Sequence, residues 1–264
     1  MHAHFLDPYQ DRRSLVHQLD ARIKLVLVVA FILTTALTPM GAWPVYVLLL
    51  ALALAAELVS ELGIGFYLKR ALLALPFVLA ALPVLVTIPG TPLLQLPFGL
   101  SISAAGLERF LSISLKSWIS VQMAVLLAST APFPTLLMAM RALRLPRLLV
   151  AIIGLMWRYL FVMVDEALRL MRAREARSSH SDQPGLKAGG KLVWRARVTG
   201  GMAGSLFLRS LERSDRIYNA MLSRGYDGEV RTLPTPAISP GEWVTLGIGL
   251  AVLCSLLALS QWLR

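Results

Sequence analysis

Cysteine, charged residues and enzyme motifs are all scarce in this sequence. Its single cysteine, Cys254, excludes a disulfide framework and a thiol metal site. Charged residues make up 16% of the 264 positions, against about 25% in a typical soluble domain. HExxH, CxxC and a serine–histidine–aspartate signature are missing. His2 and His4 are typical of a solvated tail rather than of a metal site. We therefore expect no catalytic residues, no metal site and no cofactor.

One glycine-rich loop approaches a nucleotide-binding motif without meeting its requirements. Residues 185–192 nearly fit the Walker A pattern, but Leu192 stands where a magnesium-binding Ser or Thr is needed. The polar residues before the loop are not those of a β-strand. The interpretation is a flexible basic loop, with neither a nucleotide nor a nucleic acid as its ligand.

Apolar residues and one basic block dominate what is present. Hydrophobic residues make up 56% of the chain, and its net charge is +11. Residues 141–231 hold 17 of the 26 Lys and Arg against 8 acids, a net charge of +9 in that segment. An apolar chain with one basic block is typical of a multi-span protein of the lipid bilayer with a large cytoplasmic segment. No cleavable signal is evident at the N-terminus.

The hydropathy pattern predicts an all-α polytopic membrane protein with about five transmembrane helices and additional long cytoplasmic helices. We divide it into 1–130 with the N-terminal tail and four spans, 131–231 as a cytoplasmic helical domain, and 232–264 with the last span. The predicted spans are Ile23–Leu37, Pro44–Leu58, Leu72–Ile88, Leu107–Ala128 and Trp243–Leu259.

The distribution of basic residues predicts a cytoplasmic N-terminus, because every basic cluster then lies inside. Leu148–Val164 resembles a further span, but it contains Arg158, which is costly in a bilayer. We therefore expect it to lie beneath the spans, packed on protein. A helix from Arg147 to Arg177 would be about 46 Å long.

A stretch of fourteen residues occurs twice, at 165–178 and 212–225. Each copy begins with an acid, Asp165 or Glu212, and an arginine follows four residues later, the favourable order for an ion pair on a helix. Each copy ends in a small–Arg–small triplet, which is Ala176-Arg177-Ser178 in the first and Ser223-Arg224-Gly225 in the second. One such arginine would merely complement a helix dipole. The repeated frame predicts two helices that each present an arginine at the C-terminal end.

The second of these helices carries two packing signals. Gly200 and Gly204 form a small-xxx-small pair that would let another helix approach closely. One helical face is expected to pack on the first helix, and its residues are Phe207, Leu211, Ser214, Tyr218 and Leu222.

Several of these motifs resemble the transmembrane T component of energy-coupling factor (ECF) transporters. The general resemblance rests on the paired triplets, on Leu19-Asp20-x-Arg22-x-Lys24-Leu25 and on Pro-Phe-Pro134 with Leu-Pro146. The cobalt-transport CbiQ type is most similar, through Arg158-Tyr-Leu-Phe-Val with Asp165-Glu166, Ser205-Leu-Phe-Leu-Arg209-Ser and Tyr218-x-Ala220-Met-Leu-x-Arg224-Gly225-Tyr226-Asp227-Gly228.

The resemblance implies a non-catalytic subunit of a bacterial or archaeal cytoplasmic membrane. It implies two ATP-binding-cassette ATPase subunits as partners at the helix ends, and a separate substrate-binding S component in the membrane. The ATPase-coupling residues would be Ala176, Arg177, Ser178, Ser223, Arg224 and Gly225. This sequence departs from the family at Ala21, where Pro is usual, and at Ser178, where Gly is usual. Because of Ser178, Arg174 is a second candidate in place of Arg177. The repeat favours Arg177.

The substrate and the class of transporter stay open. Cobalt follows from the resemblance, with nickel or a vitamin as alternatives. The other function class is a stand-alone membrane carrier, which would want a charged site at mid-membrane. Lys116 is the only charged candidate near the middle of a predicted span.

Overall fold

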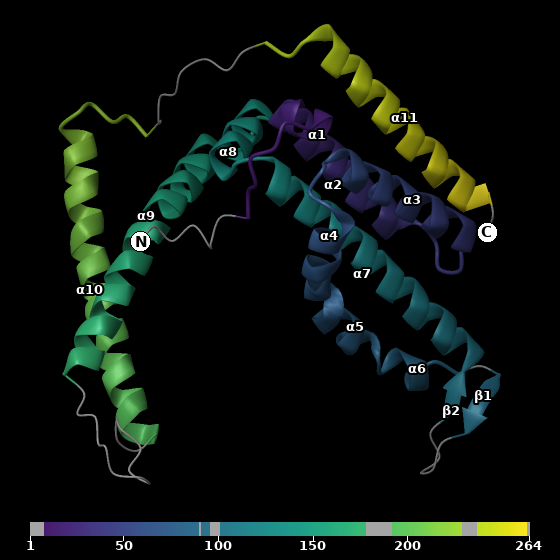
Figure 1. Cartoon of the computed structure of the whole chain (residues 1–264), viewed down its shortest axis with the longest axis horizontal. Helices are drawn as coiled ribbons and strands as arrows, with labels where there is room; N and C mark the ends of the chain where they lie inside the picture. The colour runs from purple at the N-terminus through teal and green to yellow at the C-terminus, as the bar shows by residue number, and fades with distance from the viewer. Residues whose placement is uncertain (1–7, 90, 96–100, 178–191, 229–236, 263–264) are drawn as a thin grey trace. The chain divides into compact units, whose positions relative to one another are not determined.

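The computed structural model describes residues 8–89, 91–95, 101–177, 192–228 and 237–262 (Figure 1). The elements are α1 (Leu15–Gln18), α2 (Ala21–Leu37), α3 (Trp43–Val59), α4 (Ile64–Ala71), the 3₁₀ turn η2 (Leu72–Ala74), α5 (Leu75–Ala81), α6 (Val84–Thr87), β1 (Pro92–Gln95), β2 (Ser101–Ser103), α7 (Ala104–Thr130), α8 (Phe133–Ala142), α9 (Arg147–Ala176), α10 (Leu192–Leu222) and α11 (Pro240–Trp262). The all-α polytopic prediction is confirmed. The short antiparallel hairpin β1–β2 lies in the loop predicted between the third and fourth spans.

The described chain divides into two compact units. One lies within Arg144–Pro234 and contains α9 and α10, and the other combines Pro8–Leu143 with Thr235–Arg264. The sequence-based division grouped 131–231 together, whereas α8 belongs structurally to the larger unit, because it packs against α2.

Four helical stretches of the described chain are long and apolar enough to cross a membrane. They are Ile64–Thr87, Ala104–Thr130, Arg147–Ala176 and Pro240–Trp262, and the 17-residue α3 is a shorter apolar helix. The stretch at Ile64 begins before the predicted Leu72, because α4 continues through η2 into α5. Pro76 in the first turn of α5 and Pro83 before α6 mark its breaks, as expected for residues that cannot donate a helix hydrogen bond.

Helix α9 agrees with its prediction in length, since it forms one 30-residue helix from Arg147 to Ala176. Within the unit that it shares with α10, no described residue of α9 is buried. Ile152 and Met156 on its apolar side are exposed in that unit.

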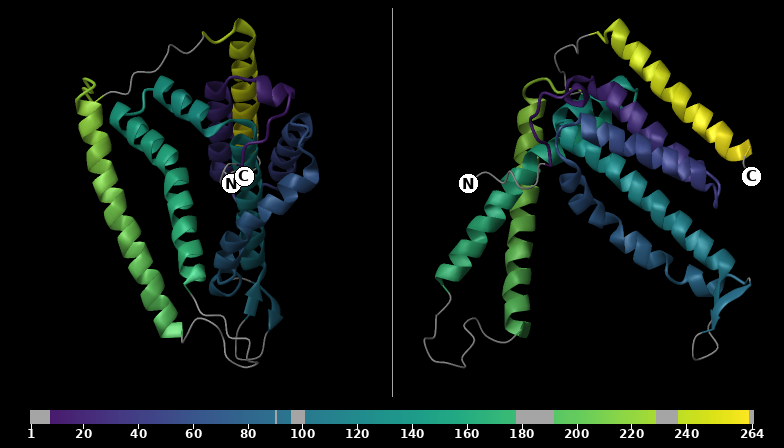
Figure 2. Two further views of the ribbon diagram at one scale, coloured as in Figure 1. Left: turned by 60° about the vertical axis from the view of Figure 1, so that its left-hand side comes forward. Right: turned by 45° about the vertical axis from the view of Figure 1, so that its right-hand side comes forward.

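The core of the larger unit lies between α2, α3 and α7, and α4 and α11 add to it (Figure 2). Asp20 begins α2 by accepting a hydrogen bond from the Arg22 backbone N–H at 2.8 Å. Gly249 lets α11 approach α2, because a Cβ there would stand 2.5 Å from Leu27 Cδ2. The buried cluster contains Val28, Phe31, Ala42, Val45, Leu49, Ala53, Tyr67, Ile119, Met123, Val125, Leu126 and Leu253.

Two lysines join α2 and α7 in a reciprocal way. Lys24 on α2 is buried, and its Nζ donates to the Thr130 carbonyl at the end of α7 (3.0 Å) and to the His17 carbonyl (3.0 Å). Lys116 on α7 donates in turn to the Ala36 and Thr38 carbonyls at the end of α2. An ammonium group at a helix C-terminus satisfies carbonyls that have no partner within the helix. Each lysine therefore caps the other's helix.

We expect Lys24→Met to lower the free energy of unfolding by about 1–3 kcal/mol, because it leaves the His17 and Thr130 carbonyls without their donor. Lys69→Met is the matched control, since Lys69 is exposed on α4, and should change stability by less than about 0.5 kcal/mol. Thermal unfolding of both purified variants in one detergent measures the difference. Equal melting temperatures would contradict the capping role.

Candidate functional site

The C-terminal end of α10 has the geometry that its sequence predicts. Gly225 adopts a φ of +79°, and its N–H bonds the Leu222 carbonyl at 2.9 Å. The Tyr226 N–H reaches back to the Met221 carbonyl at 3.0 Å. These two bonds form a Schellman motif, which favours glycine because other residues are strained at positive φ. Arg224 is held just before this stop, with its side chain exposed.

The end of α9 presents Arg177 in the capping position. Its backbone N–H bonds the Arg174 carbonyl at 3.1 Å, and both Ala176 and Arg177 are exposed. Ser178 lies outside the described residues. Within them, the Arg177 and Arg224 side chains make no hydrogen bond or ion pair. Both guanidinium groups are therefore available to a partner.

Arg174, the second candidate, is engaged by its own chain. Its Nη1 donates to Thr199 Oγ1 on α10 at 3.3 Å, and the residue is only partly exposed. This contact ties α9 to α10 and favours Arg177 over Arg174 as the docking residue.

Helices α9 and α10 lie side by side in opposite directions (Figures 1 and 2). Glu166 contacts Arg209 and Arg213, whereas Arg174, farther along α9, contacts Thr199, which is earlier on α10. The Arg177 end therefore lies near the beginning of α10. Arg224 lies 25 residues beyond Thr199, or roughly 40 Å along the helix. The pair thus presents its two exposed arginines at opposite ends.

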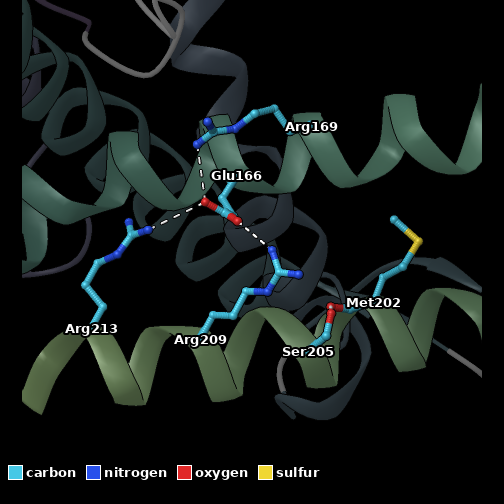
Figure 3. A network of polar contacts seen from close by, with 6 residues as sticks. All are labelled: Glu166, Arg169, Met202, Ser205, Arg209 and Arg213. Carbon is cyan, nitrogen blue, oxygen red and sulfur yellow. Dashed lines mark hydrogen bonds and ion pairs between the residues drawn. The ribbon is translucent and has the colours of Figure 1, made fainter.

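A cluster of one acid and three arginines joins the two helices (Figure 3). The Glu166 carboxylate accepts from Arg209 at 2.9 Å and from Arg169 at 3.2 Å, and Arg213 lies 3.6 Å away. Glu166 lies outside the apolar stretch Leu148–Val164. The hydrogen bond from Arg209, with the charges of the three arginines, holds the pKa of the Glu166 carboxyl below its ordinary value. The sequence pattern paired Arg169 with Asp165, but the structure pairs it with Glu166 instead.

The predicted packing face of α10 is turned away from α9. Phe207, Leu211, Tyr218 and Leu222 are 61%, 48%, 54% and 47% exposed, and Ser214 is exposed too. Residues two apart on an α-helix lie about 200° apart around its axis. Arg209 and Arg213, which contact α9, are therefore on the side opposite Phe207 and Leu211. The prediction that this stripe packs on α9 is wrong for the described chain.

Gly200 and Gly204 also do not pack as predicted. A Cβ on either glycine would meet no atom within 4 Å, so α9 does not approach the pair. The physical reason is that Gly200 and Gly204, seven and three residues before Phe207, lie on the same helical face as the stripe, which is turned away from α9.

The remaining predictions concern metals, nucleotides and charged sites in the membrane. Within the described residues no group of three or more His, Cys, Asp and Glu could hold a metal. His2, His4 and residues 185–191 lie outside the described residues. Lys116 caps α2.

Sequence reasoning missed Glu166 as a link between the two helices. The spacing of Arg209 and Arg213 by one helical turn was a usable signal for it.

Comparison with known proteins identifies a family that matches most of the chain. The CbiQ family, described as cobalt transport protein, matches residues 12–234. The chain is 28% identical to the cobalt transport protein CbiQ of Rhodobacter capsulatus, over 61% of this chain and 62% of that protein. It is 26% identical to the energy-coupling factor transporter transmembrane protein EcfT of Lactococcus lactis, over 81% of each chain. With EcfT of Lacticaseibacillus paracasei it shares 28% identity over 93% of this chain and 94% of that protein.

Proposed function

The chain belongs to the CbiQ cobalt transport family, and from this premise we propose that it couples ATP hydrolysis by two partner ATPases to Co²⁺ uptake through a substrate-binding membrane component. It is a polytopic membrane protein of the energy-coupling factor type. The observation that carries the proposal is the pair of exposed arginines, Arg177 and Arg224, at opposite ends of α9 and α10.

Two separated arginines suit a pair of ATPase subunits better than a single partner. Subunits of one kind present the same groove twice, and the two helix ends repeat one small–Arg–small triplet. A guanidinium group can donate several hydrogen bonds in a fixed plane to carbonyl or carboxylate oxygens. We assign one ATPase to the end with Ala176 and Arg177, and the other to Ser223, Arg224 and Gly225.

The exposed stripe of α10 suits the third partner. Phe207, Leu211, Tyr218 and Leu222 form one apolar face that α9 does not cover. A membrane-embedded S component offers an apolar surface that could bury this face, so we assign the stripe to it. The unit with α9 and α10 would lie on the cytoplasmic side together with the N-terminus, as the basic residues predict.

A stand-alone carrier is the second candidate, and one residue favours it. Glu57 on α3 is fully buried, and neither carboxylate oxygen has a hydrogen-bond partner. An acid inside a membrane bundle is the kind of residue that a cation carrier would use. Against this, Lys24 and Lys116 are engaged with helix ends.

Binding of Co²⁺ to the purified full-length chain separates the two functions. As a coupling component, the chain alone should bind no Co²⁺ in calorimetry, while the chain assembled with its ATPases and S component should support uptake. Ni²⁺ run in parallel tests the alternative metal. Stoichiometric Co²⁺ binding that Glu57→Gln abolishes would overturn the coupling function and establish the carrier.

A further inference from the structure

Polar side chains make the specific contacts between α9 and α10. No described residue of either helix is buried. The side-chain contacts between them include Glu166 with Arg209 and Arg213, and Arg174 with Thr199. Since no side chain of either helix is fully buried, these directional polar contacts are well placed to set the geometry of the pair.

Glu166 is the only carboxylate in its cluster, and it faces guanidinium groups from both helices (Figure 3). Arg169 is contributed by α9, and Arg209 and Arg213 are contributed by successive turns of α10. Its side chain is 14% exposed, so solvent screens it less than it screens a surface acid. Without this carboxylate, Arg169 would repel Arg209 and Arg213, and attraction between the helices would become repulsion.

Glu166 lies between the two arginine ends of the helix pair, so the angle between the helices at Glu166 affects the distance between Arg177 and Arg224. The contact of Arg174 with Thr199 lies about 12 Å farther along α9, near Arg177. Arg224 lies about 16 Å beyond Arg213 on the other side. A small change of angle at Glu166 therefore moves Arg224 relative to Arg177.

We propose that Glu166 is a positioning residue that locks the angle between α9 and α10, and so fixes the spacing of Arg177 and Arg224. The carboxylate holds the two helices as one rigid body, so that a displacement imposed at one arginine reaches the other. This role rests on the proposed coupling function, but the lock itself is a property of the chain alone.

The distance between spin labels on the two helices tests the lock directly. Labels attached to Ala173→Cys and Ala220→Cys, both exposed positions, in a Cys254→Ser background would be measured in the full-length chain in lipid nanodiscs. We expect one narrow distance peak without further substitution, and loss of that peak in Glu166→Gln. Glu212→Gln is the matched control, because Glu212 is an exposed acid on the same helix pair, and it should keep the narrow peak.

Exchanging the charges between the two helices distinguishes a specific ion-pair contact at Glu166 from a general requirement of Glu166 for folding. Combining Glu166→Arg with Arg209→Glu and Arg213→Glu restores opposite charges across the contact, and should restore the narrow peak. In the assembled transporter, Glu166→Gln should keep its ATPases yet lose transport per ATP hydrolysed. An unchanged peak in Glu166→Gln, or no recovery on reversal, would overturn the lock. A broadened peak with transport per ATP intact would refute its role in coupling.

The two proposals can fail separately. If Arg177→Ala and Arg224→Ala leave ATPase binding unchanged while Glu166→Gln broadens the peak, the lock stands and the proposed function fails.

Discussion

Replacing both Arg177 and Arg224 with alanine is expected to abolish association with the ATPase subunits and, with it, transport. Each guanidinium group is exposed and without a side-chain partner in the described chain, so a partner groove can take its full set of donors. Loss of an arginine from the centre of an interface typically costs about 2 kcal/mol or more, roughly thirtyfold in affinity. Either single variant should therefore weaken the complex, and the double variant should release both ATPases.

Arg174→Ala is the matched control for this experiment. Arg174 lies one turn before Arg177 but donates to Thr199 within the chain, so its loss should affect ATPase binding much less. Co-purification of the ATPases with each variant, from membranes containing equal amounts of the chain, measures the effect. Release by Arg174→Ala and retention by Arg177→Ala would show that the triplet was assigned to the wrong register. Retention by the double variant would refute the coupling function.

The helix ends could be predicted from sequence because their causes are local. Gly225 supplies a positive φ, and Asp20 supplies a side-chain acceptor for the first turn of α2. The long helix from Arg147 to Ala176 begins directly after Pro146 and contains no proline. Such features need only a few neighbouring residues, which a single sequence contains.

Which residues each helix face contacts could not be predicted from the sequence, because these contacts join residues far apart in the chain. The apolar stripe of α10 was recognised correctly as one face, but periodicity does not say what covers it. Glu166 and Arg209 are 43 positions apart, and their ion pair turns the stripe outward. The contacts of Lys116 could not be predicted for the same reason, since its hydrogen bonds to the end of α2 link positions about eighty residues apart.

Leu211→Asp is expected to release the S component while leaving the ATPases bound. Leu211, the second residue of the stripe, is 48% exposed, and burying a leucine side chain in an interface is worth about 1.5–3 kcal/mol. An aspartate there would in addition bury a charge without a partner. We therefore expect affinity for the S component to fall by at least about tenfold. Capture of the S component from detergent extracts, with the ATPases measured in the same samples, gives both quantities.

Asn219→Asp provides the control, since it adds an acid to α10 at an exposed position outside the stripe. It should bind both partners as the unaltered chain does. Because Leu211 lies opposite the side that carries Arg209 and Arg213, Leu211→Asp should also leave the contact of Glu166 with Arg209 undisturbed, and the label distance between α9 and α10 should not change. Full retention of the S component by Leu211→Asp would remove the stripe from its binding surface. Loss of the S component and the ATPases together would indicate that the substitution unfolds α10 instead, because the arginine ends and the stripe are separate surfaces of the same helix.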